Sequence, residues 1–81
     1  MDFKDRMIAL IARVGELSIE QIGEIIGKKL IEDYYFDSVK LVQLLVEIED
    51  EFGIVLDDDE IDTEKINSLD MLFRIVEDKT L

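Results

Sequence analysis

Apolar residues recur at intervals of three and four along most of the chain, the spacing that places them on one face of an α-helix. In residues 3–14 this face consists of Phe3, Met7, Leu10 and Val14. Asp2 is suited to cap the start of such a helix because its carboxylate can accept backbone N–H groups, and Gly15 is suited to end it. The pattern therefore predicts a first helix over residues 3–14.

The next part of the chain has a weaker pattern. Ser18 and Gln21 match a capping box, in which each side chain accepts a hydrogen bond from the other residue's backbone N–H. The box predicts a helical turn through Ile19, Ile22 and Ile26, and Gly27 then interrupts the chain. From Gly27 to Phe36 we expect a connecting segment, which is anchored in the core by Leu30, Ile31 and the aromatic residues Tyr34 to Phe36.

The strongest helical pattern runs from Ser38 to about Phe52, and Gly53 is placed to stop it. Asp57 and Glu60 form another capping box, which predicts a short third helix. A last helix, capped by Asn67 or Ser68, has an apolar stripe of Leu69, Leu72, Phe73 and Val76. Proline and internal repeats are absent, so we expect residues 1–81 to form one domain, an all-α, small four-helix bundle with a short third helix.

The helix predicted from Ser38 to Phe52 has two apolar faces. One consists of Leu41, Leu44, Leu45, Ile48 and Phe52 and is the expected core face. The other consists of Val39, Val42 and Val46, with Gln43, Glu49 and Asp50 beside it. These valines could be buried in a central helix or be isolated surface residues, but an apolar strip edged with acids favours a docking face for a partner protein.

Charge narrows the choice of partner. The chain has 21 acidic and 9 basic residues and a formal net charge of −12, which opposes binding to nucleic acids or anionic membranes and favours proteins with basic patches. No signal-peptide segment or run of membrane-spanning length is visible, so we expect a cytoplasmic monomer without stable membrane insertion. The acids from Asp57 to Asp62 do not match the ligand spacing of a calcium-binding loop, and we predict no metal site there.

Ser38 is the best candidate for covalent chemistry. The chain has no cysteine and no histidine, so no imidazole could activate the hydroxyl as a hydrolase does. If Asp37 is the helix cap, Ser38 lies in the first turn, where an attached phosphate would be near unpaired backbone N–H groups. We therefore predict no catalytic residue, and we interpret Ser38 as a site that another enzyme modifies.

The chain resembles the acyl carrier proteins. The resemblance covers nearly all of it and rests on Leu30 to Asp33, Asp37-Ser38-Val39, the acidic helix from Leu44 to Phe52, and Ile66 to Leu69. It implies that Ser38 carries 4′-phosphopantetheine, transferred from coenzyme A by a carrier-protein synthase (a phosphopantetheinyl transferase) that uses magnesium. The arm would supply the thiol for acyl thioesters in fatty-acid, polyketide or related synthesis.

The resemblance also implies roles for other residues. Acyl groups would be sheltered near Leu41, Leu44 and Ile66. Acyl-transferring enzymes with basic patches would dock on Val39, Val42, Gln43, Val46, Glu49 and Asp50.

Departures from the usual carrier pattern favour a specialised carrier. Tyr35 and Phe36 replace a glycine and a small residue, Lys40 stands where an acid is common, and Gln43 replaces a usual glutamate. Residues 37–52 are also similar to D-alanyl carrier proteins, so an aminoacyl cargo stays open, whereas the pattern of peptidyl carriers is absent. The alternative of a different class is an acidic helical adaptor that carries no cofactor and binds basic partners through the same valines.

Overall fold

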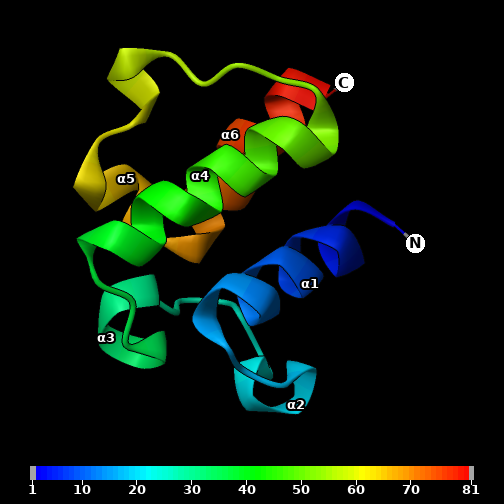
Figure 1. The fold of residues 1–81 in the computed structure, drawn as a ribbon, viewed down its shortest axis with the longest axis vertical. Helices are drawn as coiled ribbons and strands as arrows, with labels where there is room; N and C mark the ends of the chain where they lie inside the picture. The colour runs from blue at the N-terminus through cyan, green and yellow to red at the C-terminus, as the bar shows by residue number, and fades with distance from the viewer. Residues whose placement is uncertain (1, 81) are drawn as a thin grey trace.

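The computed structural model describes residues 2–80 and shows an all-α fold. Its helices are α1 (Phe3–Gly15), α2 (Ile19–Ile22), α3 (Leu30–Tyr34), α4 (Ser38–Phe52), the 3₁₀ turn η1 (Asp58–Glu60), α5 (Thr63–Asn67) and α6 (Leu69–Thr80). The long helix α4 crosses the front of the molecule, with α1 packed along it and α6 behind it, and α2 and α3 lie together at one end (Figure 1). Within residues 2–80 the only β-type pairing is an isolated antiparallel bridge between Lys29 and Ser68.

Helix α1 begins as predicted but ends differently. The Asp2 side chain accepts a hydrogen bond from the backbone N–H of Asp5 at 2.8 Å. Gly15 is the last helical residue, and Glu16 takes the left-handed conformation that we expected of the glycine. Gly15 serves a packing purpose instead, because a Cβ there would lie 2.7 Å from Cε1 of the buried Phe36 ring.

The capping box of Ser18 and Gln21 is present at the start of α2. The predicted continuation through Ile26 is wrong, because Gly23, with φ +56° and ψ −137°, ends the helix after Ile22. Ile25 is buried, whereas Ile26 is 73% exposed.

The segment from Gly27 to Phe36 contains the helix α3, which we did not predict. Leu30, Tyr34 and Phe36 are buried as expected, but Ile31 and Tyr35 are exposed. The Tyr34 hydroxyl donates a hydrogen bond to the carbonyl oxygen of Ile22 at 2.7 Å, which ties α3 to α2. Burial, followed by the nearby carboxylates of Asp33 and Glu24, raises the pKa of Tyr34 above its usual 10.0.

Helix α4 has the predicted bounds and the predicted core face. Gly53 ends it in the left-handed conformation, where a residue without Cβ has no steric penalty. The buried residues of its inner face are Leu41, Leu44, Leu45 and Ile48, with Phe52 partly buried against the core. They meet the buried faces of α1 and α6, whose fully buried residues include Met7, Ile11, Leu69, Leu72 and Val76.

The predicted short third helix begins later than we expected. The capping box of Asp57 and Glu60 is present, but it starts only the 3₁₀ turn η1. Helix α5 follows, and its cap is Asp62, whose carboxylate accepts a hydrogen bond from the N–H of Glu64 at 2.9 Å. Of the two predicted caps of α6, Ser68 takes that position, with its hydroxyl 3.4 Å from the N–H of Met71.

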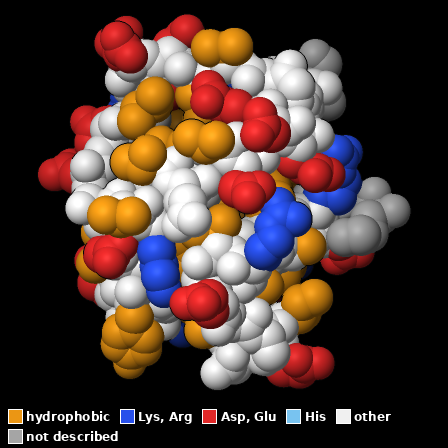
Figure 2. Space-filling view, in the orientation of Figure 1, with side chains coloured by type: hydrophobic (Ala, Val, Ile, Leu, Met, Phe, Trp, Pro, Cys, Tyr) orange, Lys and Arg blue, Asp and Glu red, His pale blue; other side chains and the backbone are white. Residues whose placement is uncertain are grey.

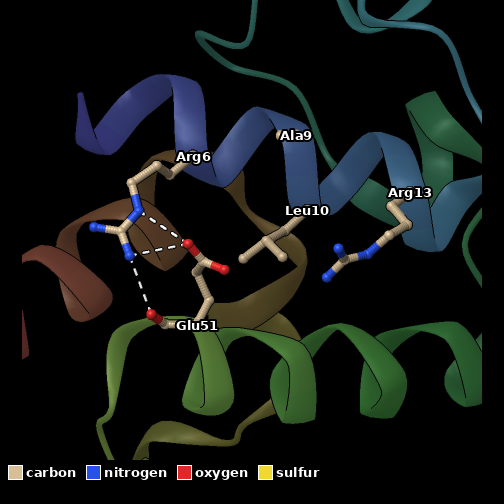
Figure 3. Close-up of a pocket in the computed structure, with 5 residues that line it drawn as sticks. All are labelled: Arg6, Ala9, Leu10, Arg13 and Glu51. Carbon is tan, nitrogen blue, oxygen red and sulfur yellow. Dashed lines mark hydrogen bonds and ion pairs between the residues drawn. The ribbon is translucent and has the colours of Figure 1, made fainter. Parts of the chain in front are cut away.

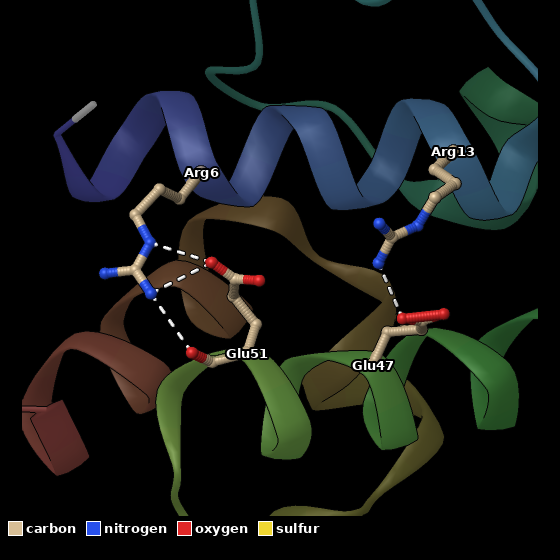
Figure 4. Close-up of polar contacts among 4 residues, drawn as sticks. All are labelled: Arg6, Arg13, Glu47 and Glu51. Atoms are coloured by element: carbon tan, nitrogen blue, oxygen red, sulfur yellow. Dashed lines mark hydrogen bonds and ion pairs between the residues drawn. The ribbon is translucent and has the colours of Figure 1, made fainter.

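Two ion pairs join α1 to α4 across the surface (Figure 4). Arg6 donates hydrogen bonds from Nε and Nη2 to the Glu51 carboxylate at 3.0 and 2.9 Å, and its guanidinium also lies 4.5 Å from the centre of the Phe52 ring. Arg13 lies 2.6 Å from the Glu47 carboxylate. Between the two arginines is a surface hollow lined by Ala9, Leu10 and Glu51 (Figure 3). Because the arginines are already paired with acids, we interpret this hollow as part of the α1–α4 contact.

Candidate functional site

Ser38 is the first residue of α4 and is exposed. The preceding residue, Asp37, has extended backbone, and its Oδ1 accepts a hydrogen bond from the N–H of Lys40 at 2.8 Å. The cap satisfies one of the backbone donors of the first turn, and the N–H groups of Ser38 and Val39 have no acceptor within the helix. The hydroxyl therefore lies at the positive end of a helix of 15 residues.

The other serines of the chain, Ser18 and Ser68, are in a different situation. Each is an N-cap whose hydroxyl oxygen accepts a backbone hydrogen bond, from Gln21 at 3.1 Å and from Met71 at 3.4 Å. Within residues 2–80 the Ser38 hydroxyl takes part in no hydrogen bond. It is thus the serine whose oxygen is available to an outside enzyme without loss of a helix cap.

A groove on the outer face of α4 begins at Ser38. It has a volume of about 540 Å³ and is lined by Ser38, Val39, Val42, Gln43, Val46 and Glu47. The three valines are 70, 61 and 51% exposed, which confirms that they lie outside the core. Figure 2 shows apolar side chains gathered on the face that α4 presents to the viewer, with acidic side chains around them.

One acidic residue of this groove was missed in the sequence. Glu47 lines it, and its carboxylate is held by Arg13 of α1. The helical spacing of Glu47 relative to Gln43 could have indicated this place, but the pairing with Arg13 depends on how α1 packs on α4. Lys40, which also departs from the carrier pattern, has its Nζ 4.0 Å from the Glu16 carboxylate.

Glu49 and Asp50, which we expected to bind partners, differ in their surroundings. Glu49 is partly buried, and its carboxylate accepts a hydrogen bond from the N–H of Leu56 at 2.9 Å. Asp50 is exposed, and its side chain has no hydrogen bond or ion pair within residues 2–80. The carboxylate of Glu49 therefore stabilises the turn after α4, whereas that of Asp50 is directed to solvent.

The residues expected to shelter an acyl chain lie in the core. Leu41, Leu44 and Ile66 are 4, 1 and 5% exposed, and they belong to the cluster of buried apolar side chains that forms the core, with Leu41 and Leu44 contributed by α4 and Ile66 by α5. The next residue, Asn67, bridges α5 to α3, because its Oδ1 accepts from the N–H of Ile31 at 2.7 Å and its Nδ2 donates to Glu32 at 2.8 Å.

A family model described as the phosphopantetheine attachment site matches residues 5–73, which is most of the chain. The chain belongs to this family. Members carry a covalently attached 4′-phosphopantetheine and are carrier domains, which phosphopantetheinyl transferases modify. A search of curated proteins found no match.

The surroundings of Ser38 fit a phosphopantetheine group. An exposed hydroxyl without internal hydrogen bonds can be esterified, and backbone N–H groups of the first turn of α4 favour a phosphate beside it. Among residues 2–80 no helix is long and apolar enough to span a membrane, and no cluster of three or more acidic residues is arranged to hold a metal ion.

Proposed function

We propose that this carrier protein holds acyl groups as thioesters on a 4′-phosphopantetheine arm attached to Ser38, and that it presents them to enzymes of fatty-acid, polyketide or related synthesis. The proposal rests chiefly on one observation: Ser38 is the exposed first residue of a long helix, beside an apolar groove, in a chain that matches the phosphopantetheine attachment family. The bound arm supplies the thiol that the polypeptide lacks. The compartment that we propose is the cytoplasm.

The protein's part in this function is to present a hydroxyl. Ser38 would form a bond from its oxygen to the phosphorus of coenzyme A that bears the pantetheine, with loss of adenosine 3′,5′-bisphosphate. The serine has no histidine to remove its proton, since the chain contains none, so the transferase and its magnesium ion must supply that step. We therefore propose that the chain is a substrate and carrier rather than an enzyme.

Partner enzymes would dock over the groove on the outer face of α4 that is lined by Val39, Val42 and Val46, the valine groove. Val39, Val42 and Val46 offer an apolar contact, and polar contacts come from Gln43 in the groove and from the exposed Asp50, one helical turn after Val46. The net charge of −12 would steer basic surfaces toward this face, with an effect that weakens as salt is added. We assign Glu49 a weaker part than its position on the helix suggested, because its carboxylate already bonds to Leu56.

The decisive experiment is intact-mass analysis of the full chain after incubation with coenzyme A, magnesium and a phosphopantetheinyl transferase. We expect the wild-type protein to gain the mass of one phosphopantetheine and Ser38→Ala to gain none. Because Ser38 is exposed and caps nothing, the variant should keep the wild-type circular dichroism spectrum and melting temperature.

Ser68→Ala is the matched control, since it removes a hydroxyl from the start of another helix. It should still be loaded, with a somewhat lower melting temperature because a helix cap is lost. A wild-type chain that gains no mass would exclude the carrier function in favour of the acidic adaptor, and a Ser38→Ala chain that is still modified would exclude Ser38 as the attachment site.

The cargo requires a separate measurement. The mass of the loaded species isolated from cells distinguishes an acyl chain from an aminoacyl group such as D-alanine. An aminoacyl mass would be consistent with attachment at Ser38. It would replace the proposed fatty-acid or polyketide synthesis with a pathway that transfers amino acids.

A further inference from the structure

Tyr35 is the most exposed of the large apolar or aromatic side chains that the structure leaves at the surface. It is 85% exposed, although the aromatic residues on either side of it, Tyr34 and Phe36, are 7 and 3% exposed. Three consecutive aromatic residues therefore divide into two that anchor the chain and one that faces solvent. Packing in the fold does not account for a tyrosine at this position.

The backbone at Tyr35 also disfavours a tyrosine. Tyr35 follows the last residue of α3 in the left-handed conformation, with φ +60° and ψ +31°. Glycine and asparagine adopt this conformation readily at the ends of helices, whereas a bulky side chain is strained there. Strained residues that persist in a structure occur preferentially at functional sites.

Neighbouring contacts hold the backbone in this conformation. The Tyr34 hydroxyl bonds to the carbonyl of Ile22, the Phe36 ring packs on Gly15, and Asn67 accepts a hydrogen bond from the N–H of Ile31 at the start of α3. These contacts come from α2, α1 and α5 respectively. The exposed ring is thus carried on a turn that is fixed to the rest of the protein from several sides.

The place of this turn determines what the ring can meet. Tyr35 precedes Ser38 by three residues, which can span at most about 11 Å. A typical protein–protein contact covers about 800 Å² of each partner, equivalent to a patch with a radius of about 16 Å. An enzyme that acts on the Ser38 hydroxyl must bring its active site to the start of α4, and the Tyr35 turn lies within the radius of a typical contact centred there.

We propose that Tyr35 is a specificity-determining contact for the phosphopantetheinyl transferase that modifies Ser38, with its ring packed on an apolar or cationic side chain of that enzyme. Exposed aromatic residues on a rigid backbone are the side chains that most often dominate the binding energy of interfaces. The inference rests on the proposed attachment at Ser38, and it adds a contact outside the valine groove of α4.

The test compares Tyr35→Asn with the wild-type apo protein in steady-state transfer by a purified carrier-protein synthase with coenzyme A and magnesium. Asparagine relieves the backbone strain and removes the ring. We expect the melting temperature to stay equal or rise, the KM for the carrier to rise about tenfold, as for loss of a strong interface contact, and kcat to stay unchanged. A residue with a purely structural role would not give stability and recognition effects of opposite sign.

Two further variants separate the ring from the backbone. Tyr35→Phe keeps the aromatic ring, so its KM should stay close to that of the wild type, in contrast to Tyr35→Asn. Glu16→Asn relieves the other non-glycine residue that has a positive φ among residues 2–80, +56°, and should change the melting temperature without changing KM.

Unchanged KM in Tyr35→Asn would overturn the proposal, as would an equal rise in KM in Glu16→Asn. A wild-type chain that is not modified at all would instead refute the attachment at Ser38, so the two failures are distinguishable.

Discussion

The two ends of α4 use their side chains in opposite ways. At the C-terminal end, the Glu51 carboxylate pairs with Arg6, the Glu49 carboxylate binds the N–H of Leu56, and the Phe52 ring contacts Phe3 with 5.4 Å between ring centres. At the N-terminal end, Ser38 and Val39 are exposed and the groove opens beside them. Polar groups thus close one end of the helix, and apolar groups face solvent at the other.

This difference changes which residues of α4 are assigned to recognition. An acidic helix in a carrier suggests that its carboxylates meet basic partners, yet Glu47, Glu49 and Glu51 each have an internal partner. The exposed valines at the other end have no such partner within the protein. Apolar surface stabilises a protein when it is buried, so an apolar patch that stays exposed commonly marks a binding surface. The surface at the N-terminal end of α4 is therefore the stronger indication of a docking site.

The largest effect on stability that we expect concerns the buried contact between Gly15 and Phe36, next to the N-terminal end of α4. Gly15→Ala would place a Cβ 2.7 Å from the Phe36 ring, which is buried and has little room to move. Overpacking of this kind costs about 1–3 kcal/mol, against about 1 kcal/mol gained when alanine replaces glycine in a helix. We expect a net loss near 1 kcal/mol and a fall of about 4–8 °C in the melting temperature, measured by circular dichroism.

Phe36→Leu in the Gly15→Ala background is the matched test of this cause. A smaller side chain at position 36 should make the alanine less costly than it is in the wild-type protein, which a double-mutant cycle would detect. A melting temperature that rises in Gly15→Ala alone would show that the N-terminal end is not held by this contact.

A smaller effect should separate two neighbouring acids of α4. Glu49→Gln weakens the acceptor of the Leu56 N–H, and because the site is partly buried we expect a loss of about 1 kcal/mol or less in unfolding free energy. Asp50→Asn removes the same charge without breaking an internal bond, so stability should stay within about 0.5 kcal/mol while partner binding at low salt weakens.

Urea denaturation and a binding titration with the transferase would measure the two quantities. Equal stability of Glu49→Gln and Asp50→Asn would contradict the internal role of Glu49. Equal binding of Asp50→Asn and the wild type would remove Asp50 from the docking face.

The smallest effect that we expect is a change of stability with pH at the ion pair of Glu60 and Lys79, near the C-terminal end of the chain. The backbone N–H of Asp57, and then Lys79 at 3.0 Å, lower the pKa of Glu60 below its usual 4.5, and Glu60 in turn raises the pKa of Lys79 above 10.5. The stability from Glu60 is therefore lost as pH falls through its lowered pKa, and the stability from Lys79 is lost as pH rises through its raised pKa.

Lys79→Gln should melt slightly below the wild type at a constant difference between about pH 5 and 9, and the difference should shrink outside that range. Lys4→Gln is the control for loss of an exposed positive charge. A difference that does not change with pH would exclude the ion pair as its cause.

Local signals in the sequence were enough to predict the long helices and the exposed position of Ser38 at the start of one of them. Asp2 and Asp37 cap helices through bonds to backbone groups three residues away, Gly53 ends α4, and Ser38 lies exposed as expected. These features depend on short-range geometry and on the spacing of apolar residues, and both can be predicted from the sequence. The family match over residues 5–73 agrees with the resemblance carried by those same segments.

The tertiary structure alone decided the features that depend on contacts between distant residues. Helix α3 has no side-chain cap at Lys29, and its first turn is satisfied by Asn67, 36 residues after Ile31. Gly15 is a site of close packing because Phe36 reaches it, and Glu49 is a structural residue because the chain turns back to bring Leu56 to it. Such pairings cannot be predicted from spacing along the chain, since their energy comes from groups that only folding brings together.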